Sequence, residues 1–156
     1  MSKVWYLGVD PGKTGGLGAY CGETQEAEAW RCPPDEYTTK ALMESVVSGR
    51  PIRLAVMERV GSRPENGVKQ AFSFGANVGG WRMALAFSGV PFREITPQEW
   101  QRGVFDARAG SKGLDKKKRS LDLARRLFPG VDLRFEKDDG KAEALLMALY
   151  ASIREF

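Results

Sequence analysis

Four acidic residues lie where the chain can bring carboxylates together. Asp10 ends an apolar, β-rich segment directly before a glycine-rich turn, and Glu58 ends another such segment. Asp139 and Glu143 stand four positions apart at the start of a helical pattern, which places both side chains on nearly the same helix face with about 6 Å of rise. If the two strands are neighbours and the helix begins over their ends, the four carboxylates converge.

Clustered carboxylates repel one another and are costly to desolvate unless a cation joins them. Mg²⁺ is a hard ion that prefers oxygen ligands and commonly binds a few carboxylates together with water and substrate phosphate. Two such ions about 4 Å apart can activate a water and stabilise the leaving oxygen of a phosphodiester. The four acidic residues therefore favour metal-dependent phosphodiester hydrolysis.

Each acidic residue also has an ordinary structural interpretation. Asp10 precedes a Pro-Gly pair and fits a turn residue, and Glu58 stands beside an arginine with which it can form a surface pair. Glu143 can interact with the dipole of its helix, and Asp138 is best interpreted as the cap of that helix. The metal hypothesis depends on all four acids together and on the order of the strands.

Composition narrows the classes of function. The chain has 156 residues, of which 42% are hydrophobic and 28% charged, and we expect one soluble domain spanning residues 1–156. Histidine is absent, which excludes histidine-activated nucleophiles and histidine-ligated zinc. Cys21 and Cys32 are too few for a disulfide framework, so we expect them reduced. We expect no membrane span and no signal peptide, and place the protein in the cytoplasm of a bacterial cell or phage-infected host.

Positive charge is concentrated in one segment. The net charge is +4, from 24 basic and 20 acidic residues. Residues 102–126 contain nine basic against three acidic residues, whereas residues 1–50 contain five basic against seven acidic. This asymmetry favours a polyanion as partner, and a solvated helix face remains the alternative.

Hydrophobic periodicity and turn residues predict an α/β fold. We expect strands at residues 4–10, 17–21, 27–31, 53–58 and 92–95, helices at 36–48, 68–88, 114–128 and 139–155, and a short helix opened by Thr96-Pro97. A loop is expected at residues 103–113. Three consecutive strands followed by alternating helices and strands imply a mixed five-stranded sheet flanked by helices.

Gly12-Lys13-Thr14 is similar to the end of a phosphate-binding P-loop. That motif requires four residues between its glycines, but only three separate Gly8 from Gly12. The turn also leads into residues 17–21, which have the pattern of a strand and not of a helix. The sequence therefore predicts no nucleotide cofactor.

Five segments occur in order along nearly the whole chain: Val9–Gly16, Val56–Glu58, Ile95–Pro97 with Trp100, Lys116–Lys118 with Leu121–Pro129, and Asp139–Leu145. Together they resemble the motifs of RuvC-family Holliday junction resolvases, which belong to the RNase H-like superfamily. The last two acids are four apart, as Asp and Glu, which is more similar to phage and organellar relatives than to the bacterial enzymes.

The resemblance implies an RNase H-like fold and a homodimer that makes paired nicks in four-way DNA junctions, during recombination or DNA processing. It implies a two-metal-ion endonuclease that uses Mg²⁺, with Mn²⁺ as a substitute. Its catalytic metal ligands would be Asp10, Glu58, Asp139 and Glu143. One lysine would assist near the scissile phosphate, and the choice among three stays open: Lys116, Lys117 and Lys118.

Two departures from the family pattern concern DNA contacts. Gly61 stands near the place of an aromatic residue that follows the Glu in bacterial enzymes, and the lysine usual near Gln101 is missing. Phe72 or Phe74 can substitute for the aromatic wedge. The side chains that we expect to contact DNA are Lys13, Arg59, Arg63, Lys69, Phe72, Phe74, Lys112 and Arg119.

The long predicted helix contains Gly75, Gly79 and Gly80. A glycine inside a helix lowers stability by up to about 1 kcal/mol relative to alanine. We therefore expect a closely packed helix or a DNA backbone to occupy the space that the missing side chains leave. We expect dimer contact together with DNA contact at this helix, with simple core packing as the alternative.

Two other functions remain open from the sequence. One is a different RNase H-like nuclease that acts on RNA–DNA hybrids or flaps. The other is a junction-binding protein without catalysis, although DNA binding alone gains nothing from clustered negative charge.

Overall fold

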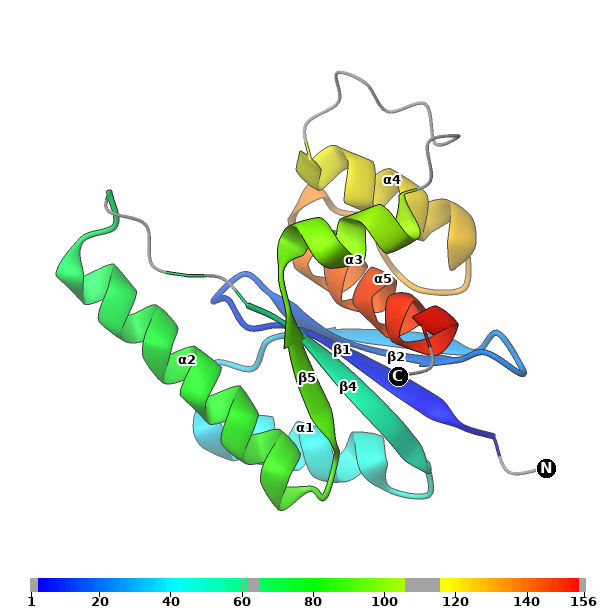
Figure 1. Ribbon diagram of the computed structural model, residues 1–156, viewed down its shortest axis with the longest axis horizontal. Helices are drawn as coiled ribbons and strands as arrows, with labels where there is room; N and C mark the ends of the chain where they lie inside the picture. The colour runs from blue at the N-terminus through cyan, green and yellow to red at the C-terminus, as the bar shows by residue number, and fades with distance from the viewer. Residues whose placement is uncertain (1–2, 60, 62–64, 106–115, 155–156) are drawn as a thin grey trace.

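The computed structural model describes residues 3–59, 61, 65–105 and 116–154, and its centre is a five-stranded sheet in the order β3-β2-β1-β4-β5 (Figure 1). The strands are β1 (Trp5–Asp10), β2 (Gly16–Cys21), β3 (Ala27–Arg31), β4 (Ile52–Glu58) and β5 (Phe92–Ile95). Strands β1, β2 and β3 form an antiparallel meander, and β4 and β5 extend it in parallel from β1. The predicted mixed sheet is therefore confirmed.

The helices are α1 (Glu36–Val47), α2 (Val68–Phe87), α3 (Pro97–Val104), α4 (Lys116–Leu127) and α5 (Asp139–Arg154). Strand and helix limits agree with the sequence within one or two residues. One local expectation was wrong, because Gly103 belongs to the last turn of α3 and not to a loop. A short 3₁₀ helix, η2 (Glu136–Asp138), which the sequence had not indicated, precedes α5. Among the described residues, no helix is both long and apolar enough to cross a membrane.

Local capping explains where two helices begin. The Asp35 side chain accepts a hydrogen bond from the backbone N–H of Thr38 at the start of α1. Thr96 accepts one from the backbone N–H of Glu99 at the start of α3, directly before Pro97. This cap sets α3 immediately after β5, above the end of the sheet.

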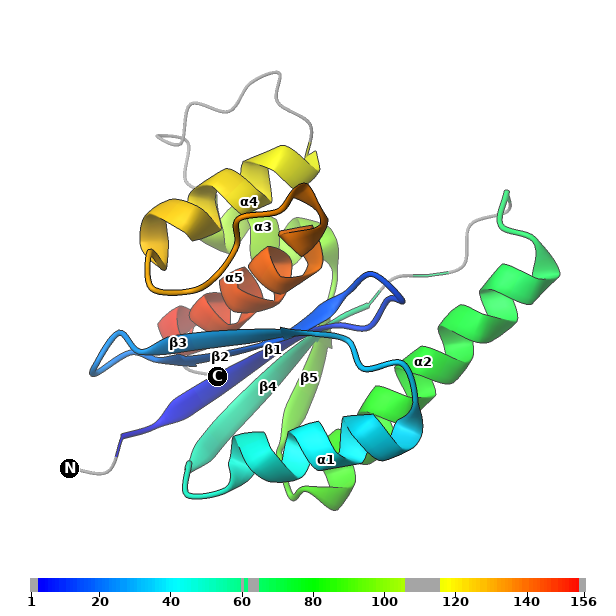
Figure 2. The same cartoon turned by 180° about the vertical axis from the view of Figure 1, so that it is seen from behind.

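The sheet separates two layers of helices, because alternate residues of a strand face opposite sides. Tyr6 and Val56 pack into a core cluster with residues of α3, α4 and α5. Leu7 and Met57 pack on the other side with residues of α1 and α2. Figure 2 shows α1 and α2 on one face of the sheet and α3, α4 and α5 on the other.

Helix α5 lies unusually close to the sheet because the strands beneath it carry glycine. A Cβ atom built on Gly18 of β2 would lie 2.6 Å from the carbonyl carbon of Ala144 and from the nitrogen of Leu145. A Cβ on Gly8 of β1 would overlap the carbonyl oxygen of Ala144. These glycines are needed for the contact between backbones, which fixes the depth of α5 over β1 and β2.

Gly18→Ala is therefore expected to destabilise the fold by about 2 kcal/mol or more, since overpacking forces backbone shifts. In a strand with free space around the glycine, the same replacement would instead stabilise the fold, because glycine lowers stability by roughly 0.5–1 kcal/mol relative to alanine there. The free energy of unfolding, measured by urea denaturation, tests the prediction.

Gly130→Ala is the matched control. No atom of the part of the chain that the structure describes lies within 4 Å of a Cβ built at Gly130, so the stability of this variant should stay within about 0.5 kcal/mol of the natural chain. Equal stability of the two variants would show that the close approach of α5 does not constrain the fold.

Candidate metal centre

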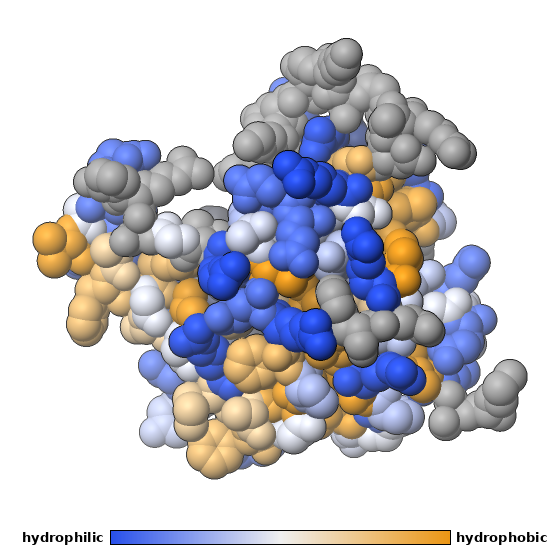
Figure 3. Space-filling model, in the orientation of Figure 1, coloured by the Kyte–Doolittle hydropathy of each residue, from blue (hydrophilic) through white to orange (hydrophobic). Residues whose placement is uncertain are grey.

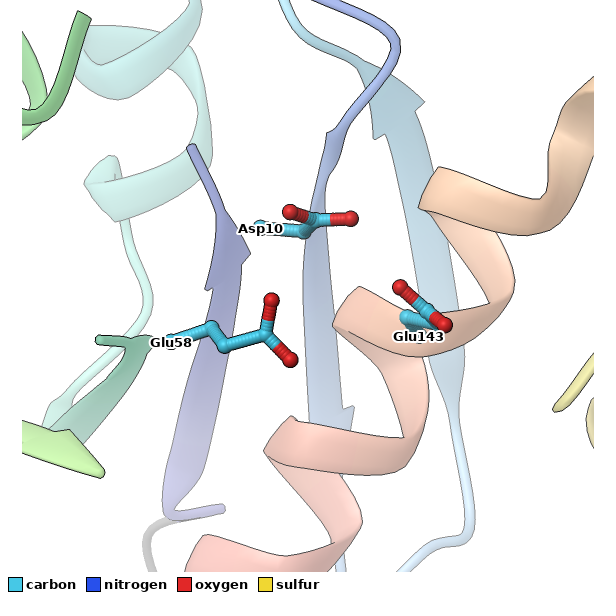
Figure 4. A group of neighbouring side chains, drawn as sticks. All are labelled: Asp10, Glu58 and Glu143. Carbon is cyan, nitrogen blue, oxygen red and sulfur yellow. The ribbon is translucent and has the colours of Figure 1, made fainter. Parts of the chain in front are cut away.

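Asp10 and Glu58 end neighbouring parallel strands, so both lie at the same edge of the sheet. Alternation along each strand also gives them the same face. Asp10 shares the side of Tyr6, and Glu58 shares the side of Val56, which is the face that α5 covers. Glu143, in the second turn of α5, approaches from the helix that packs on this face, at the right of Figure 4.

These three residues form the acidic triad. Asp10, Glu58 and Glu143 each offer a carboxylate oxygen, and these oxygens all lie within 4.8 Å of one another. Figure 4 shows the three carboxylates pointing toward one another from two strands and a helix. Asp10 and Glu58 are 48 positions apart in the chain, and Glu58 and Glu143 are 85 positions apart. The parallel pairing of β1 with β4 and the contact of α5 with both strands bring them together.

The electrostatics of the acidic triad are unfavourable without a cation. Burial raises the pKa of Glu143 to about 9, together with the charges of Asp10 and Glu58, a hydrogen bond with Asp10 and the charge of Asp139. Burial also raises the pKa of Glu58, although a hydrogen bond from Trp100 partly opposes this. A hard divalent cation would relieve the same repulsion, and the carboxylate oxygens are ligands that such ions prefer.

Asp139 lies outside the acidic triad. It is not among the residues whose ligand atoms gather within 4.8 Å, although its charge contributes to the raised pKa of Glu143. The two acids are four positions apart on α5, which corresponds to a rise of about 6 Å. Asp139 therefore lies about one turn before Glu143.

Asp138 is a buried carboxylate directly before α5. The sequence suggested it as the cap of the last helix, but its carboxylate has other partners. It accepts a hydrogen bond from Arg31 Nη2 at 2.7 Å and one from the backbone N–H of Phe135 at 3.0 Å, and it is 1% exposed. Burial raises its pKa, but these bonds and the charges of Lys141 and Arg31 hold the pKa below its ordinary value. The ion pair ties the start of α5 to the edge strand β3.

The two cysteines are free, as expected. Cys21 is buried in β2, and Cys32 donates a weak hydrogen bond from its thiol to the backbone carbonyl of Asp10, with Sγ 3.2 Å from the oxygen. Burial raises the pKa of Cys32 to about 12, helped by the charge of Asp10. Its thiol is therefore protonated and helps to fix the end of β1.

The predicted catalytic lysines lie at the start of α4, where Lys118 is exposed. Lys116 and Lys117 occupy the first two positions of that helix, and the structure describes no side chain for them. Arg119, half-buried, stacks on Phe105 with its Cζ 3.9 Å from the ring centroid. Its side chain is thus partly engaged in holding α4 against the end of α3.

The other predicted DNA contacts are spread over three elements. Lys13 in the β1–β2 turn and Arg59 after β4 are exposed, as are Lys69 and Phe72 on α2, whereas Phe74 is half-buried. Arg63 and Lys112 lie outside the described residues.

Comparison with known proteins identifies the fold. No protein-family model and no curated protein sequence matches the chain. Among solved structures, T. thermophilus RuvC in complex with Holliday junction substrate matches with a TM-score of 0.67 and 18% identity, over 97% of this chain and 94% of that chain. A further Thermus thermophilus RuvC structure matches with a TM-score of 0.62 and 18% identity, over 97% and 96% of the chains. The predicted RNase H-like fold of the RuvC type is therefore confirmed.

The raised pKa of Glu143 predicts a pH dependence of stability in the metal-free protein. The folded chain retains this proton up to about pH 9, whereas the unfolded chain loses it near the ordinary value of roughly 4.3. Stability should therefore fall as the pH rises between these values. Glu143→Gln should reduce that slope and stabilise the protein at pH 8 in EDTA by on the order of 1 kcal/mol or more.

Urea denaturation in EDTA from pH 5 to 9 measures this effect. Glu136→Gln is the matched control. Because Glu136 is exposed on η2, this variant should leave the pH dependence of stability unchanged. A Glu143→Gln protein that is less stable than the natural chain at pH 8 would contradict the electrostatic account of the site.

Proposed function

We propose that this chain is a Holliday junction resolvase, a metal-dependent endonuclease that makes paired nicks in four-way DNA junctions in the cytoplasm of a bacterial cell or phage-infected host. The observation that carries the proposal is the acidic triad, whose ligand atoms lie within 4.8 Å of one another at the ends of β1 and β4. It lies in a chain with the fold of a protein solved with a Holliday junction substrate.

The acidic triad fits divalent metal ions. Asp10, Glu58 and Glu143 would hold Mg²⁺, or Mn²⁺ in its place, with Asp139, at the start of α5, available for a second ion or for a water ligand. When bound, such ions supply an activated water and stabilise charge on the leaving oxygen of a phosphodiester. The chain's own part is to keep the three carboxylates at fixed positions that leave room for a phosphate.

Basic side chains around the triad would hold the DNA backbone. Lys118 is exposed on α4, and Lys13 is exposed in the turn that follows Asp10. A lysine from the Lys116–Lys118 run would assist near the scissile phosphate. Because these contacts go to phosphates, binding should weaken steeply with salt.

A homodimer through α2 is part of the proposal. Besides the face buried on the sheet, α2 carries a stripe at helical spacing that is exposed except at the half-buried Gly79: Val68, Phe72, Gly75, Gly79, Met83 and Phe87. Phe72 is 80% and Phe87 84% exposed, and the apolar surface of α2 projects at the left of Figure 3. No atom of the described residues lies within 4 Å of a Cβ built on Gly75, Gly79 or Gly80, so packing within the chain does not explain these glycines.

A second copy is the occupant that this stripe fits best. Glycines on an exposed helix face permit two helices to approach closely, and the large apolar residues at both ends would be buried by the contact. A two-fold dimer would present two acidic triads to the two-fold symmetry of a four-way junction.

Asp10→Asn and Glu58→Gln should each lower junction cleavage by about three orders of magnitude or more, since several kcal/mol of charge stabilisation are lost. Junction binding should survive, because the phosphate contacts are untouched. The test uses labelled four-way junction, matched linear duplex and RNA–DNA hybrid, each with Mg²⁺ and with EDTA, alongside gel-shift binding.

Asp122→Asn, an exposed acid on α4, is the control and should cleave normally. Wild-type rates in Asp10→Asn or Glu58→Gln would refute the site. Preferred cleavage of the hybrid would favour the other RNase H-like nuclease. No cleavage with either Mg²⁺ or Mn²⁺ would favour a non-catalytic junction-binding protein.

The dimer is tested by Met83→Glu in the middle of the α2 stripe, a residue that is 55% exposed. A buried charge without a partner costs several kcal/mol, so the dimer should dissociate at concentrations where the natural chain is dimeric, as measured by sedimentation equilibrium. Ile153→Glu on α5 is the control, at 60% exposure. A persisting Met83→Glu dimer, or a monomeric natural chain, would contradict this interface.

A further inference from the structure

A buried tryptophan contacts one carboxylate of the acidic triad. Trp100, on α3, is 0% exposed, and its Nε1 donates a hydrogen bond to Oε1 of Glu58 at 3.0 Å. Glu58 is itself only 8% exposed. An indole N–H is a donor only, and inside a protein it requires an acceptor. Here the acceptor is a carboxylate that also faces Asp10 and Glu143 (Figure 4).

The indole is also packed in the core. Its ring packs 6.1 Å from that of Phe105, between centroids, within the core formed by α3, α4 and α5. Helix α3 is in turn pressed onto α5, because a Cβ built on Gly103 would lie 2.5 Å from the ring of Tyr150. Trp100 therefore presents its N–H from a fixed place relative to the helix that carries Glu143.

A fixed donor constrains a flexible carboxylate. The terminal torsion of a glutamate side chain is broad, so a free Glu58 would sample several carboxylate orientations. A hydrogen bond to Oε1 selects one of them and leaves the other oxygen available to the centre of the triad. Partners of this kind orient metal ligands in proteins, and their loss typically lowers metal affinity or activity 10–100-fold.

We propose that Trp100 is a positioning residue of the acidic triad, whose indole N–H orients Glu58 for divalent metal binding. The inference rests on the proposed function, because it takes the triad to be a metal site. It differs from a packing role in one respect: the N–H matters, and not only the shape of the ring.

Replacing Trp100 by β-(3-benzothienyl)alanine separates these roles, since sulfur replaces the N–H and the ring keeps its shape. Trp100→Phe serves as a second variant that uses natural residues. Both should bind Mn²⁺ about 10-fold more weakly by isothermal titration calorimetry and need correspondingly more Mg²⁺ for half-maximal cleavage. Junction binding in EDTA should be unchanged, and the metal-free benzothienyl variant should melt close to the natural chain.

Trp5→Phe is the matched control. Trp5 is buried on the opposite face of the sheet, and Arg50 lies over its ring with Cζ 4.7 Å from the centroid. This variant should lose stability without losing Mn²⁺ affinity. If the benzothienyl protein binds Mn²⁺ within about twofold of the natural chain, Trp100 is a core residue and the inference fails.

Failure of the proposed function gives a different result. A natural chain that binds Mn²⁺ but cuts no junction would refute the resolvase, while weaker Mn²⁺ binding by the Trp100 variants would still support the positioning role. A natural chain that binds no Mn²⁺ would overturn both.

Discussion

The mutual repulsion of three carboxylates is the constraint on which this face of the sheet depends. Their ligand atoms lie within 4.8 Å, and nothing about ionised carboxylates favours that arrangement without a cation. The fold imposes it through contacts that do not involve the acids. Gly18 lets the backbone of α5 touch β2, and the ion pair of Asp138 with Arg31 holds the start of α5 on β3. Stability of the surrounding structure thus maintains a site that is electrostatically strained.

Sequence patterns predicted most of this architecture because the signals are local. Apolar strands ending in Asp10 and Glu58, and the helical spacing after Asp139, each mark an element and its end. The parallel pairing of β1 with β4 then follows from connections that cross over through α1. Element limits shifted by one or two residues where strands and helices fray. The 3₁₀ helix η2 was missed because three residues carry no periodicity.

What escaped the sequence depends on contacts between distant segments. Trp100 and Glu58 are 42 positions apart, and Asp138 meets Arg31 across 107. The sequence analysis noted Trp100 only as part of a strand-to-helix motif. The one feature that could have indicated its role is its position, because it places an indole N–H donor in the first turn of α3, close to the end of β4. Helical spacing alone predicted Asp139 beside the other acids. Its charge acts on Glu143, although its carboxylate is not part of the acidic triad.

The acidic triad lies on the face of the sheet that α5 covers, and α2 packs on the opposite face. Strand β4 ends at Glu58, and α2 begins ten residues later at Val68. A helix of 20 residues is about 30 Å long, and Trp81 and Leu85 pack α2 against the sheet that carries the acidic triad. Under the proposed function, pairing two α2 helices would therefore set the distance between two acidic triads. Under the proposed function, the residue at which the α2 helices cross then determines whether both strands of a junction are reached at once. Under the proposed function, the apolar stripe on α2 would bear on the spacing of the nicks as much as on the stability of the proposed dimer.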